Sequence, residues 1–266
     1  MNSKGGLQMI GVAKQVVKEY RSSKNPIIKF SITTLSFCWN SVKNIKRFIV
    51  DTEFRSILLL QVFNSKNVHQ TTPLTYMDRY PTIFSACRDY FIDKKDLKIL
   101  SFGCSTGEEV LTLRSYFPNA HIVGADINKR SIAICRQLPV DNKITFVHSS
   151  YSEILKHGPF DAVFCMAVLQ RKPHYIAAKG ISSIKKIYPF EKFEKQVIEL
   201  DGLLKEQGIL TVHFTQYSLM DTSVAYKYEA MGNYNQGDYR SPVFDKNSQL
   251  VNNPLPQKSI FIKSKR

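Results

Sequence analysis

Small residues and one carboxylate follow two neighbouring apolar segments, and their spacing can form a ligand site. Gly103, Ser105 and Gly107 come directly after the apolar stretch 97–102, and Asp126 ends the next apolar stretch, 23 residues after Gly103. Small residues let a ligand approach the backbone, and glycine accepts positive φ angles. A carboxylate at the end of the second strand can accept both hydroxyls of a ribose. The pattern therefore predicts a site for a nucleoside-bearing ligand.

The same spacing excludes two common phosphate-bearing ligands. A dinucleotide fingerprint needs glycines at positions 103, 105 and 108, whereas this chain has Ser105 and Glu108. A carboxylate at position 108, at the start of the following helix, repels a pyrophosphate. The phosphate loop that ends in Gly-Lys-Ser/Thr is also absent from the sequence. The small-residue turn therefore suits a ligand without phosphates.

Apolar runs alternate with amphipathic ones from residue 81 onward, which predicts strands joined by helical crossovers. Such alternation is typical of a mainly parallel sheet with helices on both faces, and ligands bind at the carboxyl ends of its strands. We expect an α/β three-layer sandwich whose seven-stranded sheet ends in an antiparallel hairpin, with Gly208 ending the last long helix. The predicted strands are 97–102, 121–125, 144–148, 160–165, 209–214, 242–245 and 259–263, and the predicted helices are 81–91, 107–117, 129–138 and 190–205.

These features resemble the class I S-adenosylmethionine-dependent methyltransferases over residues 80–214, about half of the chain. In that family the loop after the first strand has the form acid-x-Gly-x-Gly-x-Gly. Here Ser101 replaces the acid and Ser105 replaces the middle glycine. The run 104–109 is similar to the loop of the chemotaxis-receptor glutamate methyltransferases. The resemblance implies S-adenosylmethionine as cofactor and transfer of its methyl group to an acceptor: a small molecule, a glycan or a protein side chain.

The resemblance also implies a role for individual positions. The loop would face the methionine part of the cofactor, Asp126 would hold the ribose, and Ile127 would pack on the adenine. Ser150 aligns with the family's acceptor for the adenine amino group, where the family often has Asp. Two alternatives stay open: the glycines form a tight turn and no more, and Asp126 caps the helix that follows it. The predicted cofactor-binding residues are Gly103, Cys104, Ser105, Gly107, Asp126, Ile127, Ser150, Cys165 and Met166.

No catalytic residue is assigned from the sequence, because the cofactor carries the reactive group and the protein mainly positions it. A general base is needed only for an acceptor that is protonated. The candidate bases are His148, His174, His213 and Tyr217, and Arg79 with Tyr80 could reach the cofactor carboxylate. The segment 170–189 is a basic insert that could bind an anionic acceptor.

Residues 1–75 form a predicted basic helical extension that precedes a methyltransferase domain at 76–266. The first 50 residues hold nine Lys and Arg against one acid, and the whole chain has a formal net charge of +15. Amphipathic patterns predict helices at 9–21, 42–50 and 53–63, with a break at Asn25-Pro26. Such a segment can pack on the domain, lie on an acidic membrane surface or bind nucleic acid.

The cysteines and the hydropathy of the chain indicate the compartment in which we expect the protein. Its five cysteines show no CxxC spacing, so neither a disulfide framework nor a metal site is expected. No run approaches the roughly 20 apolar residues of a membrane-spanning helix, and no secretory leader opens the chain. We expect a reduced, cytoplasmic protein. The competing hypothesis is a non-catalytic module, in which the same fold binds the cofactor or a macromolecular partner.

Overall fold

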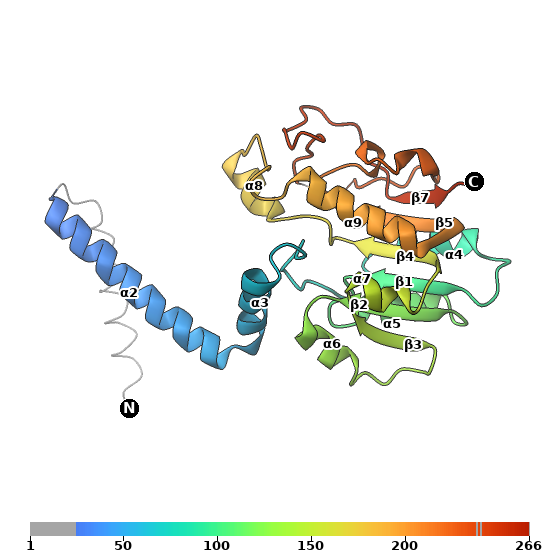
Figure 1. The fold of residues 1–266 in the computed structure, drawn as a ribbon, viewed down its shortest axis with the longest axis horizontal. Helices are drawn as coiled ribbons and strands as arrows, with labels where there is room; N and C mark the ends of the chain where they lie inside the picture. Colours follow the sequence, from blue (N-terminus) through green and yellow to red (C-terminus); the bar gives the residue numbers. More distant parts are fainter. Residues whose placement is uncertain (1–24, 238, 240, 266) are drawn as a thin grey trace. The chain divides into compact units, whose positions relative to one another are not determined.

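The structure is a computed structural model that describes residues 25–237, 239 and 241–265 (Figure 1). The chain divides into two compact units: the first ends at Leu58, and the second begins at Leu59. Residues 59–75, which we assigned to the extension, group with the second unit. The helix expected at 9–21 lies outside the described residues. A separate basic extension at 1–75 stays a prediction.

A long helix, α2 (Pro26–Val50), precedes the helix α3 (Thr52–Phe63). The Asn25 side chain accepts a hydrogen bond from the Ile27 N–H at 3.0 Å, and Pro26 occupies the first turn, where no backbone N–H is needed. Asn25 and Pro26 therefore start a helix, and the predicted helix 42–50 is only its last part. Asp51 separates the two helices and accepts a hydrogen bond from the Phe54 N–H at 2.9 Å.

Seven strands of the second unit form one sheet in the order β3-β2-β1-β4-β5-β7-β6 (Figure 1). The first five strands pair in parallel, and β7 pairs antiparallel with both β5 and β6. The predicted mainly parallel sheet with an antiparallel end is confirmed. The strands are β1 (Lys98–Phe102), β2 (His121–Asp126), β3 (Ile144–His148), β4 (Phe160–Met166), β5 (Leu204–His213), β6 (Tyr228–Ala230) and β7 (Ile260–Lys263).

Helices cover both faces of the sheet, which makes the predicted three-layer sandwich. Alternate strand residues face opposite layers, so Leu100 belongs to one apolar cluster and Ile99 to the other. The first cluster includes Val197 and Leu200 of α9, and the second includes Leu113 of α5. The helices of this unit are α4 (Pro81–Tyr90), α5 (Glu108–Tyr116), α6 (Lys129–Cys135), α7 (Tyr151–Leu155), α8 (Pro173–Lys179) and α9 (Phe190–Leu203), with short 3-10 turns η1 (Leu219–Asp221) and η2 (Ala225–Lys227).

Two details of the predicted fold are wrong. The partner of β7 is β6 and not 242–245, where Phe244 makes a single isolated bridge to Leu250. Gly208 does not end the long helix, since α9 stops at Leu203 and Gly208 lies within β5. A Cβ at Gly208 would lie 2.8 Å from the Lys205 carbonyl oxygen, so close backbone approach explains this glycine.

A buried carboxylate joins three strands at their amino ends. The Asp161 side chain on β4 accepts a hydrogen bond from the Lys98 N–H of β1 at 2.8 Å. It also pairs with the ammonium groups of Lys94 at 2.7 Å and Lys205 at 2.9 Å. Both oxygens of this carboxylate are therefore engaged within the protein, as the family resemblance implies for a structural residue at this position.

Candidate functional site

The loop between β1 and α5 has an unusual backbone at the positions that the sequence singled out. Gly103, Ser105 and Gly107 have φ angles of +81°, +50° and +102°. The N–H groups of Gly103 and Cys104 both donate to the Ala125 carbonyl oxygen, at 2.7 and 3.1 Å, which holds the loop against the end of β2. Positive φ favours glycine, so the two glycines follow from the turn itself. Ser105 adopts the same region without being glycine, which indicates a specific need for its side chain or position.

Asp126 holds the loop in this conformation. One carboxylate oxygen accepts a hydrogen bond from the Ser105 N–H at 2.9 Å, and the other accepts one from the Asn128 N–H at 2.7 Å. Each oxygen keeps a further lone pair for a ligand hydroxyl. Burial raises the pKa of Asp126, and the two N–H donors oppose that rise. The residue that caps α6 is Asn128, whose side chain accepts from the Arg130 N–H, so helix capping does not explain Asp126.

The other predicted positions lie at the carboxyl ends of neighbouring strands. The Ser149 N–H donates to the Asp126 carbonyl oxygen at 3.1 Å, which brings the exposed Ser150 beside the end of β2. Ile127 is half-buried there. Met166 is the last residue of β4, the strand next to β1. The structure therefore collects the predicted residues of four strands along one edge of the sheet.

Two predicted positions have side chains buried in the apolar clusters. Cys165 is fully buried within one apolar cluster. Cys104 is buried in the other, where a hydrogen bond with the Cys135 thiol and burial raise its pKa well above the ordinary range. Burial likewise raises the pKa of Cys165. Neither thiol is activated as a nucleophile, in agreement with the absence of a catalytic cysteine from our assignment.

Sequence reasoning missed one carboxylate of this site. Glu109, in the first turn of α5, accepts a hydrogen bond from the Ser101 hydroxyl at 2.7 Å. Burial raises the pKa of Glu109 to about 8, while the Ser101 hydrogen bond and the nearby positive charge of Arg79 lower it. The Glu109 carboxyl group thus lies within hydrogen-bond distance of position 101, where the family carries an acid. Ser101 could have indicated Glu109 from the sequence. Where the family's acid is replaced by serine, a nearby carboxylate can occupy the same place.

Comparison with known proteins agrees with this geometry. Residues 99–187 match the family described as "Methyltransferase domain". The match covers about a third of the chain. An uncharacterised protein of Rickettsia prowazekii (strain Madrid E) is 34% identical over 87 residues, 31% of this chain and 16% of that protein. The seven-stranded sheet has the mainly parallel, Rossmann-like arrangement that the resemblance predicts.

Solved structures similar to this chain include a plantazolicin methyltransferase and WbdD. The plantazolicin methyltransferase BpumL in complex with SAH is 16% identical, with a TM-score of 0.37, over 63% of this chain and 55% of that one. WbdD is 18% identical, with a TM-score of 0.42, over 73% of this chain and 41% of that one. The matched region thus spans less than two thirds of each of these proteins.

Two buried hydroxyl oxygens in or near the candidate site have no hydrogen-bond partner among the described residues. They are the Ser105 Oγ and the Tyr80 hydroxyl. Leaving a buried hydroxyl without a hydrogen bond costs about 1–3 kcal/mol. Ser105 belongs to the loop itself, and Tyr80 stands beside Arg79, whose guanidinium lies 5.1 Å from the Tyr80 ring centre. Polar atoms left open in this way suit a polar ligand, so the residues present fit a cofactor with a ribose and a charged amino acid end.

An aromatic stack surrounds the carboxyl end of β5. The rings of Tyr80 and His213 meet edge to face at 5.0 Å, His213 stacks on Phe214 at 4.2 Å, and Phe214 stacks on Tyr239 at 5.1 Å. Burial lowers the pKa of His213 to about 4, aided by the Arg79 charge, and its Nδ1 lies 2.8 Å from the Ser259 hydroxyl. His213 is therefore neutral at pH 7.

The remaining candidate bases lie in different surroundings. Tyr217 is fully buried, and its hydroxyl donates to the Tyr188 carbonyl oxygen at 2.5 Å, which makes it a core residue. His174 lies on α8 and is exposed. His148 ends β3, opposite Asp126 in the register of the two strands. His148 and His213 thus lie at the edge of the sheet that holds the candidate site, whereas Tyr217 lies in the core.

Proposed function

We propose that the chain is an S-adenosylmethionine-dependent methyltransferase. The observation that carries the proposal is the Asp126 carboxylate, held by two backbone N–H groups at the carboxyl end of β2 and beside the positive-φ loop. Parallel sheets bind nucleosides at this edge. The match of residues 99–187 to the methyltransferase domain family supports the choice of cofactor.

The roles of the chain's own residues follow from their positions. Asp126 would accept the ribose hydroxyls, and Glu109 with Arg79 would meet the ammonium and carboxylate of the methionine end. When bound, the cofactor supplies an electrophilic methyl group on a sulfonium. The protein fixes the line of approach, since transfer is an in-line displacement that gains most from orientation. A neutral His213 is available to take a proton from an acceptor that carries one.

We infer that the acceptor is anionic and binds near the start of the segment 170–189. Arg171 is half-buried there, and its guanidinium donates to the His69 carbonyl oxygen at 3.3 Å. The Tyr239 hydroxyl donates to the Gln170 side chain at 2.8 Å, so polar groups of the insert are fixed beside the end of β4. Fixed polar groups around a cation suit an acceptor with a carboxylate or a phosphate.

Titration calorimetry with S-adenosylhomocysteine tests the cofactor assignment. We expect saturable binding with one site per chain and a dissociation constant in the micromolar range, roughly −8 kcal/mol. Incubation with methyl-labelled S-adenosylmethionine and a cell extract then tests transfer. No binding at millimolar ligand contradicts the proposal. Binding without any labelled product favours the competing hypothesis of a non-catalytic module.

We also propose that α2 binds an acidic membrane surface. Its large apolar side chains are exposed: Phe30, Phe37, Trp39, Val42, Ile45 and Ile49 are each at least 60% accessible. The helix contains Lys29, Lys43, Lys46 and Arg47 and no acidic residue. A wide apolar face beside basic residues is typical of helices that lie in the plane of an anionic bilayer surface. Nucleic acid is the weaker choice, because it does not explain exposed Phe and Trp.

Trp39 offers a direct test, because it is the chain's single tryptophan. We expect its emission to shift to the blue with phosphatidylserine vesicles and to stay unchanged with phosphatidylcholine vesicles. The double substitution Phe37→Ser and Ile45→Ser should abolish the shift. Leu255→Ser, at an 86% exposed apolar position elsewhere, is the matched control. A response to duplex DNA in place of vesicles contradicts the membrane assignment.

We place the protein in the cytoplasm. All five cysteines are free thiols, and four of them are buried. No helix within the described part of the chain has the length and apolar character needed to cross a bilayer. Free buried thiols are usual in reducing compartments, which supports this location.

A further inference from the structure

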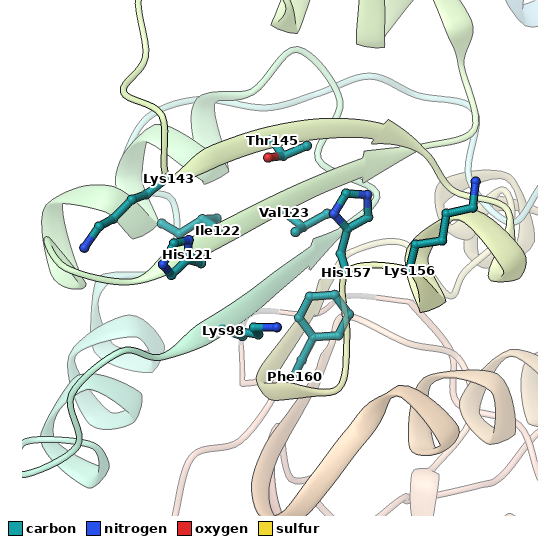
Figure 2. A pocket seen from close by; sticks show the side chains of 9 residues that line it. All are labelled: Lys98, His121, Ile122, Val123, Lys143, Thr145, Lys156, His157 and Phe160. Atoms are coloured by element: carbon teal, nitrogen blue, oxygen red, sulfur yellow. The ribbon is translucent and has the colours of Figure 1, made fainter.

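A hollow lies at the edge of the sheet opposite the candidate cofactor site. It occupies about 220 Å³ at the amino ends of β1, β2 and β3, next to the turn that leads into β4 (Figure 2). The residues of the cofactor loop lie at the carboxyl ends of the same strands and do not line it. Its lining residues are Lys98, His121, Ile122, Val123, Lys143, Thr145, Lys156, His157 and Phe160.

A repeated pattern in the sequence creates one side of this hollow. A basic residue followed by isoleucine stands at the start of each of the three neighbouring strands: Lys98-Ile99 begins β1, His121-Ile122 begins β2, and Lys143 directly precedes Ile144 of β3. Lys98 pairs with His121 in the parallel register, and Ile122 pairs with Ile144, one residue after Lys143. Paired residues of parallel strands project to the same face. Since neighbouring strands lie about 4.8 Å apart, the three basic side chains form a row roughly 10 Å long.

Because α7 is short, it does not cover the hollow. The two residues that follow this helix add two more basic side chains. This helix ends at Leu155, and of the two residues that follow, His157 lies beside Val123 of β2, while Lys156 lines the hollow from the side (Figure 2). Buried Val123 and Phe160 form the floor. The site therefore combines an apolar base with a basic rim.

The lysines on the strands are not neutralised by neighbouring acids. Among the residues that the structure describes, no carboxylate pairs with the Lys98 ammonium, because Asp161 is fully buried and is held by Lys94 and Lys205. The Lys143 ammonium lies 3.2 Å from the Asn119 carbonyl oxygen and has no acidic partner in the same part of the chain. Glu153, which is not a lining residue, pairs with Lys156 at 2.5 Å and lies 4.0 Å from the His157 ring nitrogen. Two lysine charges are thus available to an anion.

We propose that this hollow binds a small compound with two linked phosphate groups. The volume admits a compact ligand, and the length of the basic row matches two anionic groups better than one. Lysines bind phosphate as point charges, and Thr145 adds a hydroxyl on β3. The site is separate from the proposed cofactor site, so it does not depend on the proposed function.

Binding of pyrophosphate to the full chain tests this proposal by calorimetry. We expect the double substitution Lys98→Gln and Lys143→Gln to weaken pyrophosphate binding about tenfold or more, since each change removes a charge-assisted contact. The matched control is Lys66→Gln with Lys179→Gln, which removes the same charge from exposed positions outside the hollow. The control should bind as the unmodified chain does. Thermal unfolding of each variant checks that it is folded.

A second binding experiment tests whether this site is distinct from the cofactor site. Saturating S-adenosylhomocysteine should leave pyrophosphate affinity unchanged, and both double variants should keep their affinity for S-adenosylhomocysteine. The proposal is overturned if pyrophosphate does not bind, if the two double variants lose affinity equally, or if S-adenosylhomocysteine displaces pyrophosphate. Loss of S-adenosylhomocysteine binding by the unmodified chain would instead contradict the proposed function alone.

Discussion

Asp126→Ala should lower the affinity for S-adenosylhomocysteine about a hundredfold, or about 3 kcal/mol. The carboxylate has two tasks that the substitution removes together. Its free lone pairs would accept the ribose hydroxyls, and its present hydrogen bonds fix the Ser105 and Asn128 N–H groups. The loop would therefore lose both a ligand contact and the bond that shapes it. Calorimetry with the purified variant measures the change.

The control for this experiment is Asp93→Ala, which removes a carboxylate of the same kind from an exposed position. It should bind S-adenosylhomocysteine as the unmodified chain does. Asp126→Asn adds a finer test, because the amide can still accept one loop hydrogen bond while it loses the charge. We expect its affinity to fall between those of the other two proteins. Unchanged affinity in Asp126→Ala would remove Asp126 from the cofactor site.

Glu109 should release about one proton when S-adenosylhomocysteine binds at pH 7. Burial holds the pKa of this carboxyl at about 8, so the free protein carries it mostly protonated. An ammonium group placed beside it favours the ionised form, and the proton leaves to the buffer. Calorimetry in phosphate and in Tris, whose ionisation enthalpies differ, measures the number of protons released.

Glu109→Gln should abolish this proton release and weaken binding about tenfold, the loss of one charge-assisted contact. Glu108→Gln is the matched control, since Glu108 lies on the same helix and bonds the Thr106 hydroxyl at 2.7 Å. It should release as many protons as the unmodified chain. Equal proton release by Glu109→Gln and the unmodified chain would show that another group titrates.

The same carboxyl gives the ligand-free protein a pH dependence of stability. A carboxyl with a raised pKa in the folded state favours folding while it is protonated. That contribution is present below the ordinary value of 4.5 and is lost as the pH rises towards 8. The melting temperature should therefore fall between pH 5 and 8 more steeply in the unmodified chain than in Glu109→Gln.

The strands of the sheet could be predicted because their residues are apolar and their ends are marked by small or polar residues. All five parallel strands lie within one or two residues of the expected bounds, except that β5 begins at Leu204, five residues early. That extension depends on pairing with β4 and on the close approach at Gly208, which a local pattern does not contain. The short strand β6 was missed for the same reason, since its three residues are a strand only beside β7.

Contacts between distant residues were the main limit at the candidate site. The loop and Asp126 were recognisable from spacing, because both lie at strand ends that are adjacent in the sheet. The pairing of Ser101 with Glu109 depends on how α5 leaves the loop, which the sequence does not specify. Likewise, Lys98, His121 and Lys143 are far apart along the chain, and only the strand register places them in a row.

The left-handed backbone of Ser105 has a consequence for the rate and the entropy of ligand binding. A residue other than glycine in this region carries about 1–2 kcal/mol of local strain. Here that strain is balanced within the folded chain by the Asp126 hydrogen bond, which involves protein atoms alone. The entropy lost in ordering the loop is therefore part of folding and not of association. A ligand meets a surface that is already shaped, so its encounter needs no slow rearrangement of the turn.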